Sequence, residues 1–210
     1  MGKIVLATII ISGSAKWLLK VGGNKEKWYG SDRIFMYVMT VFGAMTVNYS
    51  EQCTEYGWVV SNLRLLAGCL LSAAYMDRRN CWVYNYVWWW CLPWAGILGM
   101  TAGGEFSGIV AVLVFVMLQQ LLFSRMYGKA DCHAFSVCAL AECGNAVGMV
   151  GFLLQMFLSV VLLTIVQLFR GNVTPRGRLR EPQPFIPYII TAFFSVMFLE
   201  SVFRTTYIYA

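Results

Sequence analysis

Charged residues are scarce in this 210-residue sequence, where Asp, Glu, Lys and Arg together make up 12%, against about 25% in a typical soluble domain. Hydrophobic residues make up 59% and aromatic residues 16%. This composition excludes an ordinary water-soluble domain. It predicts instead an all-α, polytopic membrane protein, with its helices bundled in a lipid bilayer.

Metal-binding and disulfide patterns are also lacking. The seven cysteines include no Cys-x-x-Cys pair, so neither a zinc site nor a disulfide framework is indicated. Most lie in or beside apolar runs, where cysteine packs as a small apolar side chain, and we expect no metal and no other cofactor. The net charge of +6 would suggest nucleic acid in a soluble chain. Here the basic residues lie between apolar runs, where they set membrane topology, so we expect no nucleic-acid partner.

Eight apolar runs are candidate membrane helices and predict seven or eight crossings in one domain over residues 1–210. The first run also resembles a cleavable signal peptide ending at Ala15. That alternative would place the basic gap at residues 20–33 outside, against the charge rule. The runs cover residues 4–19, 34–49, 58–76, 82–100, 107–124, 132–145, 148–169 and 184–203.

Basic residues gather in alternate gaps between these runs. The opposite gaps hold Glu51, Glu55 and Glu105 and neither Lys nor Arg. The positive-inside rule therefore predicts that the basic gaps face the cytoplasm and both chain ends lie outside. The split of residues 132–169 into two crossings depends on this argument, supported by a turn sequence at Cys143-Gly144-Asn145. Twelve of the sixteen basic residues share the predicted cytoplasmic side: Lys20, Lys25, Lys27, Arg33, Arg78, Arg79, Arg125, Lys129, Arg170, Arg176, Arg178 and Arg180.

The chain has only three aspartates, and two of them are placed to meet. Asp32 lies in a basic gap and is interpreted as a solvated surface charge. Asp77 follows the run at residues 58–76, and Asp131 comes seven residues after Ser124, so both are expected at the cytoplasmic level. If their helices pack together, close like charges force one carboxyl to retain its proton near neutral pH.

A pair of carboxyls sharing one proton suits peptide hydrolysis. The ionised member removes a proton from the attacking water, and the protonated member donates to the developing oxyanion. A structural alternative also accounts for these positions, since Asp77 could pair with Arg78 or Arg79, and Asp131 with Lys129, at the headgroup boundary.

Three local sequences narrow these alternatives. They are Asp77-Arg78-Arg79-Asn80-Cys81-Trp82-Val83-Tyr84-Asn85, Gly128-Lys129-Ala130-Asp131 and Pro184-Phe185-Ile186-Pro187-Tyr188. In this order they resemble the motifs of the type IV prepilin peptidases, a family of GxGD-type membrane aspartic peptidases with preflagellin-peptidase-like short forms. The family has an Asp, a basic run and Ile-Pro-Asn, then Gly-x-Gly-Asp, then Pro-Phe-Gly-Pro. The resemblance covers residues 58–203, and residues 1–57 would add two N-terminal apolar segments.

The match departs from the family at four positions. Tyr84 stands where the family usually has Pro, Ala130 and Ile186 stand where it usually has Gly, and His133 stands where a Lys commonly follows the second Asp. Ala130 would carry a physical cost only if the motif required a positive φ there, which glycine tolerates and alanine does not.

The resemblance implies an aspartic endopeptidase of a bacterial plasma (inner) membrane, with its active site facing the cytoplasm. Its partners would be pilin-like precursor proteins, cut after a glycine that ends a short basic leader, and the lipid bilayer. No oligomeric state is indicated. The zinc-binding Cys-x-x-Cys loop of larger family members is lacking, so methyltransferase activity is not supported. The resemblance makes Asp77 and Asp131 catalytic, with a site shaped by Asn85, Gly128, Ala130, His133, Pro184, Phe185 and Pro187.

A small proton- or cation-coupled transporter, or a membrane scaffold, is the alternative function, with Asp77, Asp131 and Glu142 as ion sites. Glu142 is eleven residues after Asp131, which places both on one helix face about 16 Å apart. We interpret Glu142 and Arg64 as structural. His133 could tune the aspartate pair or occupy a helix interface. The Gly99-x-x-x-Gly103 spacing suits close helix approach.

Overall fold

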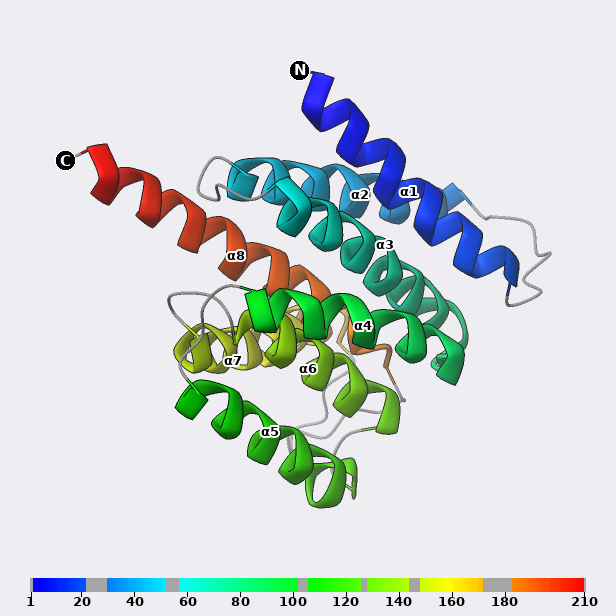
Figure 1. Cartoon of the computed structure of the whole chain (residues 1–210). Helices are drawn as coiled ribbons and strands as arrows, with labels where there is room; N and C mark the ends of the chain where they lie inside the picture. The colour runs from blue at the N-terminus through cyan, green and yellow to red at the C-terminus, as the bar shows by residue number, and fades with distance from the viewer. Residues whose placement is uncertain are drawn as a thin grey trace.

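The structure, a computed structural model, describes residues 2–21, 30–51, 57–101, 106–125, 128–143, 148–171 and 183–209. Within these residues the chain is all-helical, as predicted, and each predicted apolar run corresponds to one α-helix (Figure 1). A short 3₁₀-helix covers Phe123–Arg125. The α-helices are α1 (Gly2–Val21), α2 (Gly30–Glu51), α3 (Gly57–Asn80), α4 (Asn85–Thr101), α5 (Phe106–Leu121), α6 (Lys129–Glu142), α7 (Gly148–Phe169) and α8 (Ile186–Tyr209).

Two helix boundaries bear on the sequence predictions. Helix α6 ends at Glu142 and α7 begins at Gly148, so residues 132–169 form two helices rather than one, as predicted. The fourth run was predicted to begin at Trp82, but α4 begins at Asn85. The preceding Cys81 has a φ of 49°, in the left-handed region that ends a helix, and this separates α4 from α3.

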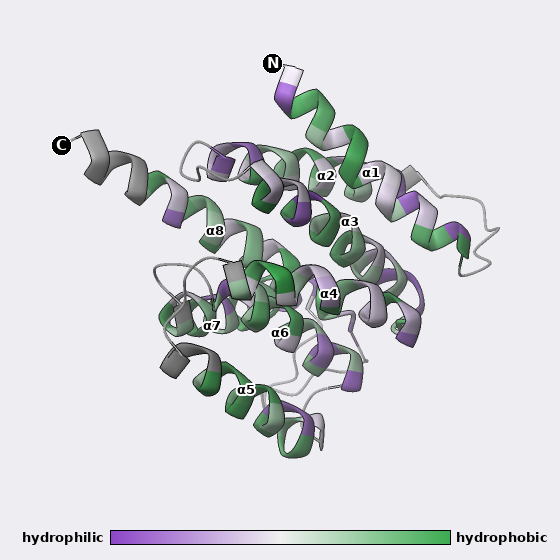
Figure 2. Ribbon diagram, in the orientation of Figure 1, coloured by the Kyte–Doolittle hydropathy of each residue, from purple (hydrophilic) through white to green (hydrophobic). Residues whose placement is uncertain are grey.

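Among the described residues, four helical segments are both long and apolar enough to cross a membrane: Gly2–Val21, Gly57–Asn80, Met149–Phe169 and Ile186–Phe203. The structure therefore supports a membrane protein with fewer clear spans than the seven or eight predicted. Helix α6 has 14 residues and is about 21 Å long, shorter than the roughly 30 Å hydrocarbon core. Hydrophobic residues run along most helices, while hydrophilic residues gather near ends such as the start of α6 (Figure 2).

Helix α3 lies at the centre of the bundle and contacts α1, α2, α4 and α8. Helices α4, α5 and α7 pack around α6, and α7 also packs along α8. The first turn of α1 and the last turn of α8 lie toward the same side of the molecule (Figure 1). Alanines and glycines allow the closest contacts: a methyl group on Gly68 of α3 would collide with Ser14 Oγ and lie 2.8 Å from the carbonyl oxygen of Ile11 on α1.

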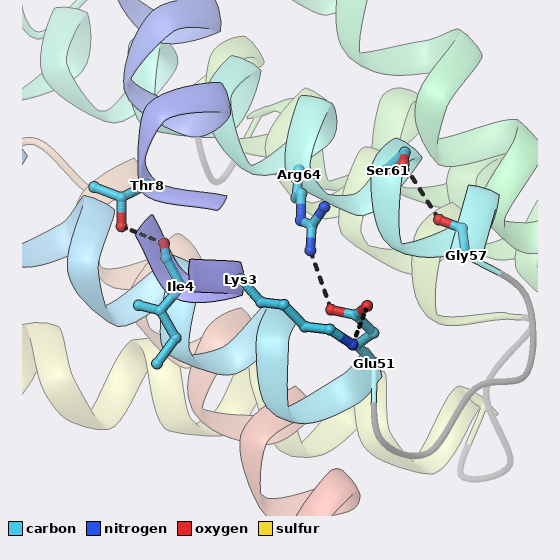
Figure 3. Close-up of polar contacts among 7 residues, drawn as sticks. All are labelled: Lys3, Ile4, Thr8, Glu51, Gly57, Ser61 and Arg64. Carbon is cyan, nitrogen blue, oxygen red and sulfur yellow. Dashed lines mark hydrogen bonds and ion pairs between the residues drawn. The ribbon is translucent and has the colours of Figure 1, made fainter. Parts of the chain in front are cut away.

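An ion-pair cluster joins α1, α2 and α3 at one end of the bundle (Figure 3). The carboxylate of Glu51 lies 3.0 Å from Lys3 Nζ and 3.1 Å from the guanidinium of Arg64. The Arg64 side chain is only 9% exposed, so a nearby carboxylate is what makes its charge tolerable in the bundle. This contact agrees with the structural interpretation of Arg64.

The N-terminal helix contributes to the core through small and branched side chains on one face. Ala7, Ile11 and Ala15, four residues apart, are fully buried, because side chains with this spacing line one side of a helix. The opposite face of α1 is exposed and apolar, as a helix at the edge of a membrane bundle requires.

Candidate active site

Asp77 lies in the last turn of α3 and caps the N-terminus of α8. Its side chain is buried, and its Oδ2 accepts a hydrogen bond from the backbone N–H of Ile186 at 2.9 Å. The N–H of Phe185 also bonds to this carboxylate. The first N–H groups of a helix have no intrahelical partner, and Pro187 is tolerated in the first turn for that reason. The first and third predicted motifs therefore meet.

Asp131, which belongs to the second motif, lies in the first turn of α6 and interacts with the charge of Asp77. Its Oδ2 accepts a hydrogen bond from the backbone N–H of Gly128 at 3.2 Å, which caps α6. Burial raises the pKa of Asp131 to about 7, and the negative charge of Asp77 raises it further, against the lowering effect of the Gly128 hydrogen bond. The two carboxyls are thus close enough to influence each other's charge. The ring centroids of Phe135 and Phe185 lie 5.8 Å apart in an edge-to-face arrangement, which packs α6 against the third motif.

Both aspartates stand at the N-terminus of a helix, Asp131 at α6 and Asp77 at α8. Because each N-terminus carries partial positive charge, a carboxylate there is stabilised. Two negative charges still repel, and the raised pKa of Asp131 reflects burial first and that repulsion second. Near neutral pH the site can therefore hold one ionised and one protonated carboxyl, an acid and a base within range of each other's charge.

The ion pairs that the structural alternative required are not formed among the described residues. Arg78 instead lies 3.6 Å from Asp32 and stacks over the Phe35 ring at 4.7 Å. Arg79 donates a hydrogen bond to the Tyr75 hydroxyl. The interpretation of Asp32 as a solvated charge was wrong, because its side chain is only 14% exposed and is held in this ion pair. Arg78 therefore pairs with Asp32, whereas Asp77 caps α8.

Gly128 and Ala130 are the two small residues of the second motif, and their surroundings do not restrict them equally. Gly128 has an extended backbone with a φ of −64°, and a methyl group there would lie 3.1 Å from Asp131 Oδ2. Ala130 lies inside α6, and Cys81 is the non-glycine residue with positive φ in the described part of the chain. Ala130 therefore meets no backbone strain, so this departure from the family motif has no cost in φ.

Among the described residues, two predicted site residues have no hydrogen bond to either aspartate. His133 is two residues after Asp131, about 200° around the helix, and its Nδ1 lies 3.3 Å from Gln120 Nε2 of α5. Its ring packs 5.9 Å from Trp88 of α4, so it occupies a helix interface. Asn85 is exposed at the start of α4, and no hydrogen bond or ion pair of the described residues joins it to either aspartate.

A cavity of about 390 Å³ lies beside the capped start of α8. Pro184 and Pro187 line it from α8 and the segment before it, and Asp32 and Arg78 line it from the α2 and α3 sides. Phe185 is 7% exposed and packs inward. Sequence reasoning did not identify the cavity or the contact of Phe135, although Phe135 comes one helical turn after Asp131 and this spacing places both on one face.

Glu142, at the other end of α6, is 2% exposed, and neither of its carboxylate oxygens has a hydrogen-bond partner. The charge of Glu200 acts on it, and its own charge acts on Cys138 one turn earlier. No hydrogen bond of the described residues therefore supports the structural interpretation of Glu142.

No protein-family model, no curated protein and no solved structure matches this chain.

Proposed function

We propose that this protein is a membrane aspartic endopeptidase with Asp77 and Asp131 as its catalytic pair. One observation carries the proposal: Asp77 of the first motif bonds to Ile186 of the third, and its charge acts on Asp131 of the second. A carboxyl pair in which one member holds a proton is the arrangement that water-mediated peptide hydrolysis requires.

The reaction follows from the two protonation states. The ionised carboxylate takes a proton from a water molecule as the water oxygen bonds to the scissile carbonyl carbon. The protonated carboxyl gives its proton to the carbonyl oxygen, which forms a neutral tetrahedral intermediate. Collapse of this intermediate breaks the C–N bond: the proton taken from water passes to the leaving amine, and a hydroxyl group of the intermediate returns a proton to the carboxylate that acted as donor. The products are a carboxylic acid and an amine, and the pair regains its starting protonation. The raised pKa of Asp131 favours Asp131 as the proton donor.

The proposed substrate is a pilin-like precursor with a short basic leader, a glycine at the cut and an apolar helix. Eight crossings would place the aspartates and the basic gaps on the cytoplasmic side of a bacterial plasma membrane. Helices α4, α5 and α6 are short for a span. Helix α6 packs among α4, α5, α7 and α8, so its backbone polar groups need not face lipid. Methyl transfer is not part of this proposal.

The deciding experiment is co-expression with a candidate precursor, followed by measurement of leader removal. Asp77→Asn and Asp131→Asn keep an oxygen that can accept the capping hydrogen bond but lose the ability to titrate. Each is expected to abolish cleavage. Asp32→Asn is the matched control, because it removes the remaining aspartate at the same end of the bundle, and it should still cut. Cleavage by Asp77→Asn or Asp131→Asn would refute the assignment of the pair.

The second candidate function is that of a small proton- or cation-coupled transporter. The buried, unpartnered carboxyl of Glu142 favours it, because an ionised carboxylate in a membrane interior needs a proton or a cation to neutralise it. This function predicts proton or cation flux into liposomes that Glu142→Gln abolishes, with no cleavage of any precursor. Cleavage without flux would reject it.

A further inference from the structure

A cavity of about 420 Å³ is lined by α1 and α2, which lie on the side of the bundle away from α6 and α7 (Figure 1). Residues Thr8, Ser12 and Lys16 line it from α1 at intervals of four. Arg33, Met36, Tyr37 and Thr40 line it from α2 at helical spacing. Because residues three and four apart share a helix face, the two helices present facing stripes. The cavity is therefore an elongated groove, about 12 Å long between the levels of Thr8 and Lys16.

One end of this groove is basic. Lys16 lies near the end of α1 and Arg33 near the start of α2, so the hairpin of the two helices brings both cations to the same end. Neither belongs to an ion pair of the described residues, and the neighbouring Asp32 is already paired with Arg78. Two exposed cations that have no carboxylate partner in the described part of the chain form a site for an anion.

The remainder of the groove carries no charge. The hydroxyl groups of Thr8, Ser12 and Thr40 donate to carbonyl oxygens of their own helices at 2.8, 3.2 and 2.6 Å. Their protons are therefore used within α1 and α2, and the groove receives mainly their carbon atoms. Met36 and Tyr37 complete this uncharged part.

The groove opens between exposed apolar faces. On α1, Val5 and Ile9 are 58% and 61% exposed, and on α2, Ile34 and Val38 are 67% and 54% exposed. Helix α1 is also one of the segments long and apolar enough to span a membrane. Side chains of this kind on a membrane helix face lipid tails, so the groove communicates with the bilayer rather than with an aqueous cleft alone.

We propose that this groove binds one anionic phospholipid. The phosphate contacts Lys16 and Arg33, and one acyl chain lies along the uncharged part toward Thr8 and Thr40. Basic pockets between membrane helices bind anionic lipid head groups by this combination of charge and apolar contact. A free phosphate would use the two cations but not the groove between the exposed faces. The site is separate from the aspartate pair, and the proposal does not depend on peptidase activity.

The test is native mass spectrometry of the purified full-length protein with phosphatidylglycerol or phosphatidylcholine of identical acyl chains. Wild-type protein is expected to retain one phosphatidylglycerol in preference to phosphatidylcholine. The double variant Lys16→Gln/Arg33→Gln should bind it about 30-fold more weakly. Lys20→Gln, which removes a cation of the same helix outside the groove, should bind as the wild type does. Equal retention of both lipids, or equal binding by the double variant, would overturn the proposal.

Two further experiments distinguish binding of the lipid head group from binding of the acyl chain. Ser12→Leu leaves both cations in place but fills the groove, and it should also weaken phosphatidylglycerol binding. Glycerol 3-phosphate, which has the phosphate but no acyl chains, should fail to displace the lipid at equal concentration. Displacement would show that a soluble phosphate suffices and would refute the lipid assignment. The conservative Lys16→Arg variant should retain the lipid, and its loss there would also count against the phosphate contact.

Discussion

The carboxylate of Asp77, near the end of α3, accepts a hydrogen bond from the backbone N–H of Ile186 at the start of α8, 109 positions later in the chain, at 2.9 Å. This bond gives Asp77 a structural role as the cap of α8 in addition to its proposed catalytic role. The two roles respond differently to substitution, because capping needs an acceptor whereas acid–base chemistry needs a titratable group. Comparing asparagine with alanine at this position separates them.

Asp77→Ala should destabilise the fold by about 1–2 kcal/mol, since it leaves the first N–H groups of α8 unpaired in a buried position. Asp77→Asn should retain most of that stability while losing catalysis. Reversible unfolding in mixed micelles measures the difference. An alanine variant as stable as the wild type would show that the N-terminus of α8 does not depend on this bond.

Peptidase activity should fall as pH rises through about 7, because the raised pKa of Asp131 means that its carboxyl loses the donated proton there. The rate of leader removal by membranes containing the protein gives the profile. Asp32→Asn, which keeps the catalytic pair intact, should show the same high-pH limb. A rate that continues to rise well above the pKa of Asp131 would contradict its assignment as the proton donor.

The same shift predicts a pH dependence of stability. The pKa of Asp131 rises from 3.8 to about 7 on folding, so the folded state holds the proton more tightly than the unfolded chain. Stability therefore decreases as pH rises between these values, and the loss is complete above the upper one. Asp131→Asn removes the titration and should gain stability relative to the wild type at about pH 8 but not at about pH 4. Parallel stability curves for the two proteins would exclude this linkage.

Glu51→Gln should destabilise the bundle by about 2–3 kcal/mol, because it leaves the nearly buried guanidinium of Arg64 without its charged partner. Lys3→Gln is the control: its side chain is 72% exposed, so its ion pair with Glu51 should contribute at most about 1 kcal/mol. Unfolding midpoints of the two variants, compared at low and high salt, test this. Equal losses of stability in the two variants would mean that the burial of Arg64 does not determine the cost of removing its charged partner.

Gly68→Ala should separate α1 from α3 and cost about 1–3 kcal/mol, since the added methyl group collides with Ser14 and Ile11. Gly96→Ala on α4 is matched to it, because a methyl group there meets no atom within 4 Å. That control should stabilise its helix by about 0.5–1 kcal/mol. Thermal unfolding distinguishes the two, and a neutral Gly68→Ala would show that the helices can move apart freely.

Much of this molecule could be predicted from local sequence. Long apolar runs determine helices, and the prediction placed a helix at each of the eight, with the break between α6 and α7 recognised from charge and the Cys143-Gly144-Asn145 turn. The number of membrane crossings was harder to predict from the sequence than the positions of the helices. Helix α6 is buried among its neighbours, and a short helix in that position need not itself satisfy the length and hydropathy of a lipid-exposed span.

The surroundings of each charged residue required the tertiary structure. Sequence order placed Asp77 and Asp131 at the ends of helices, but only packing of α3, α6 and α8 decided that they influence each other and that Arg78 pairs with Asp32 instead. The same packing places His133 beside Gln120 and Trp88. It also leaves Glu142 buried without a hydrogen-bond partner among the described residues. Local sequence determines where a helix begins and which residues share its face, whereas the neighbours of that face depend on how distant helices pack.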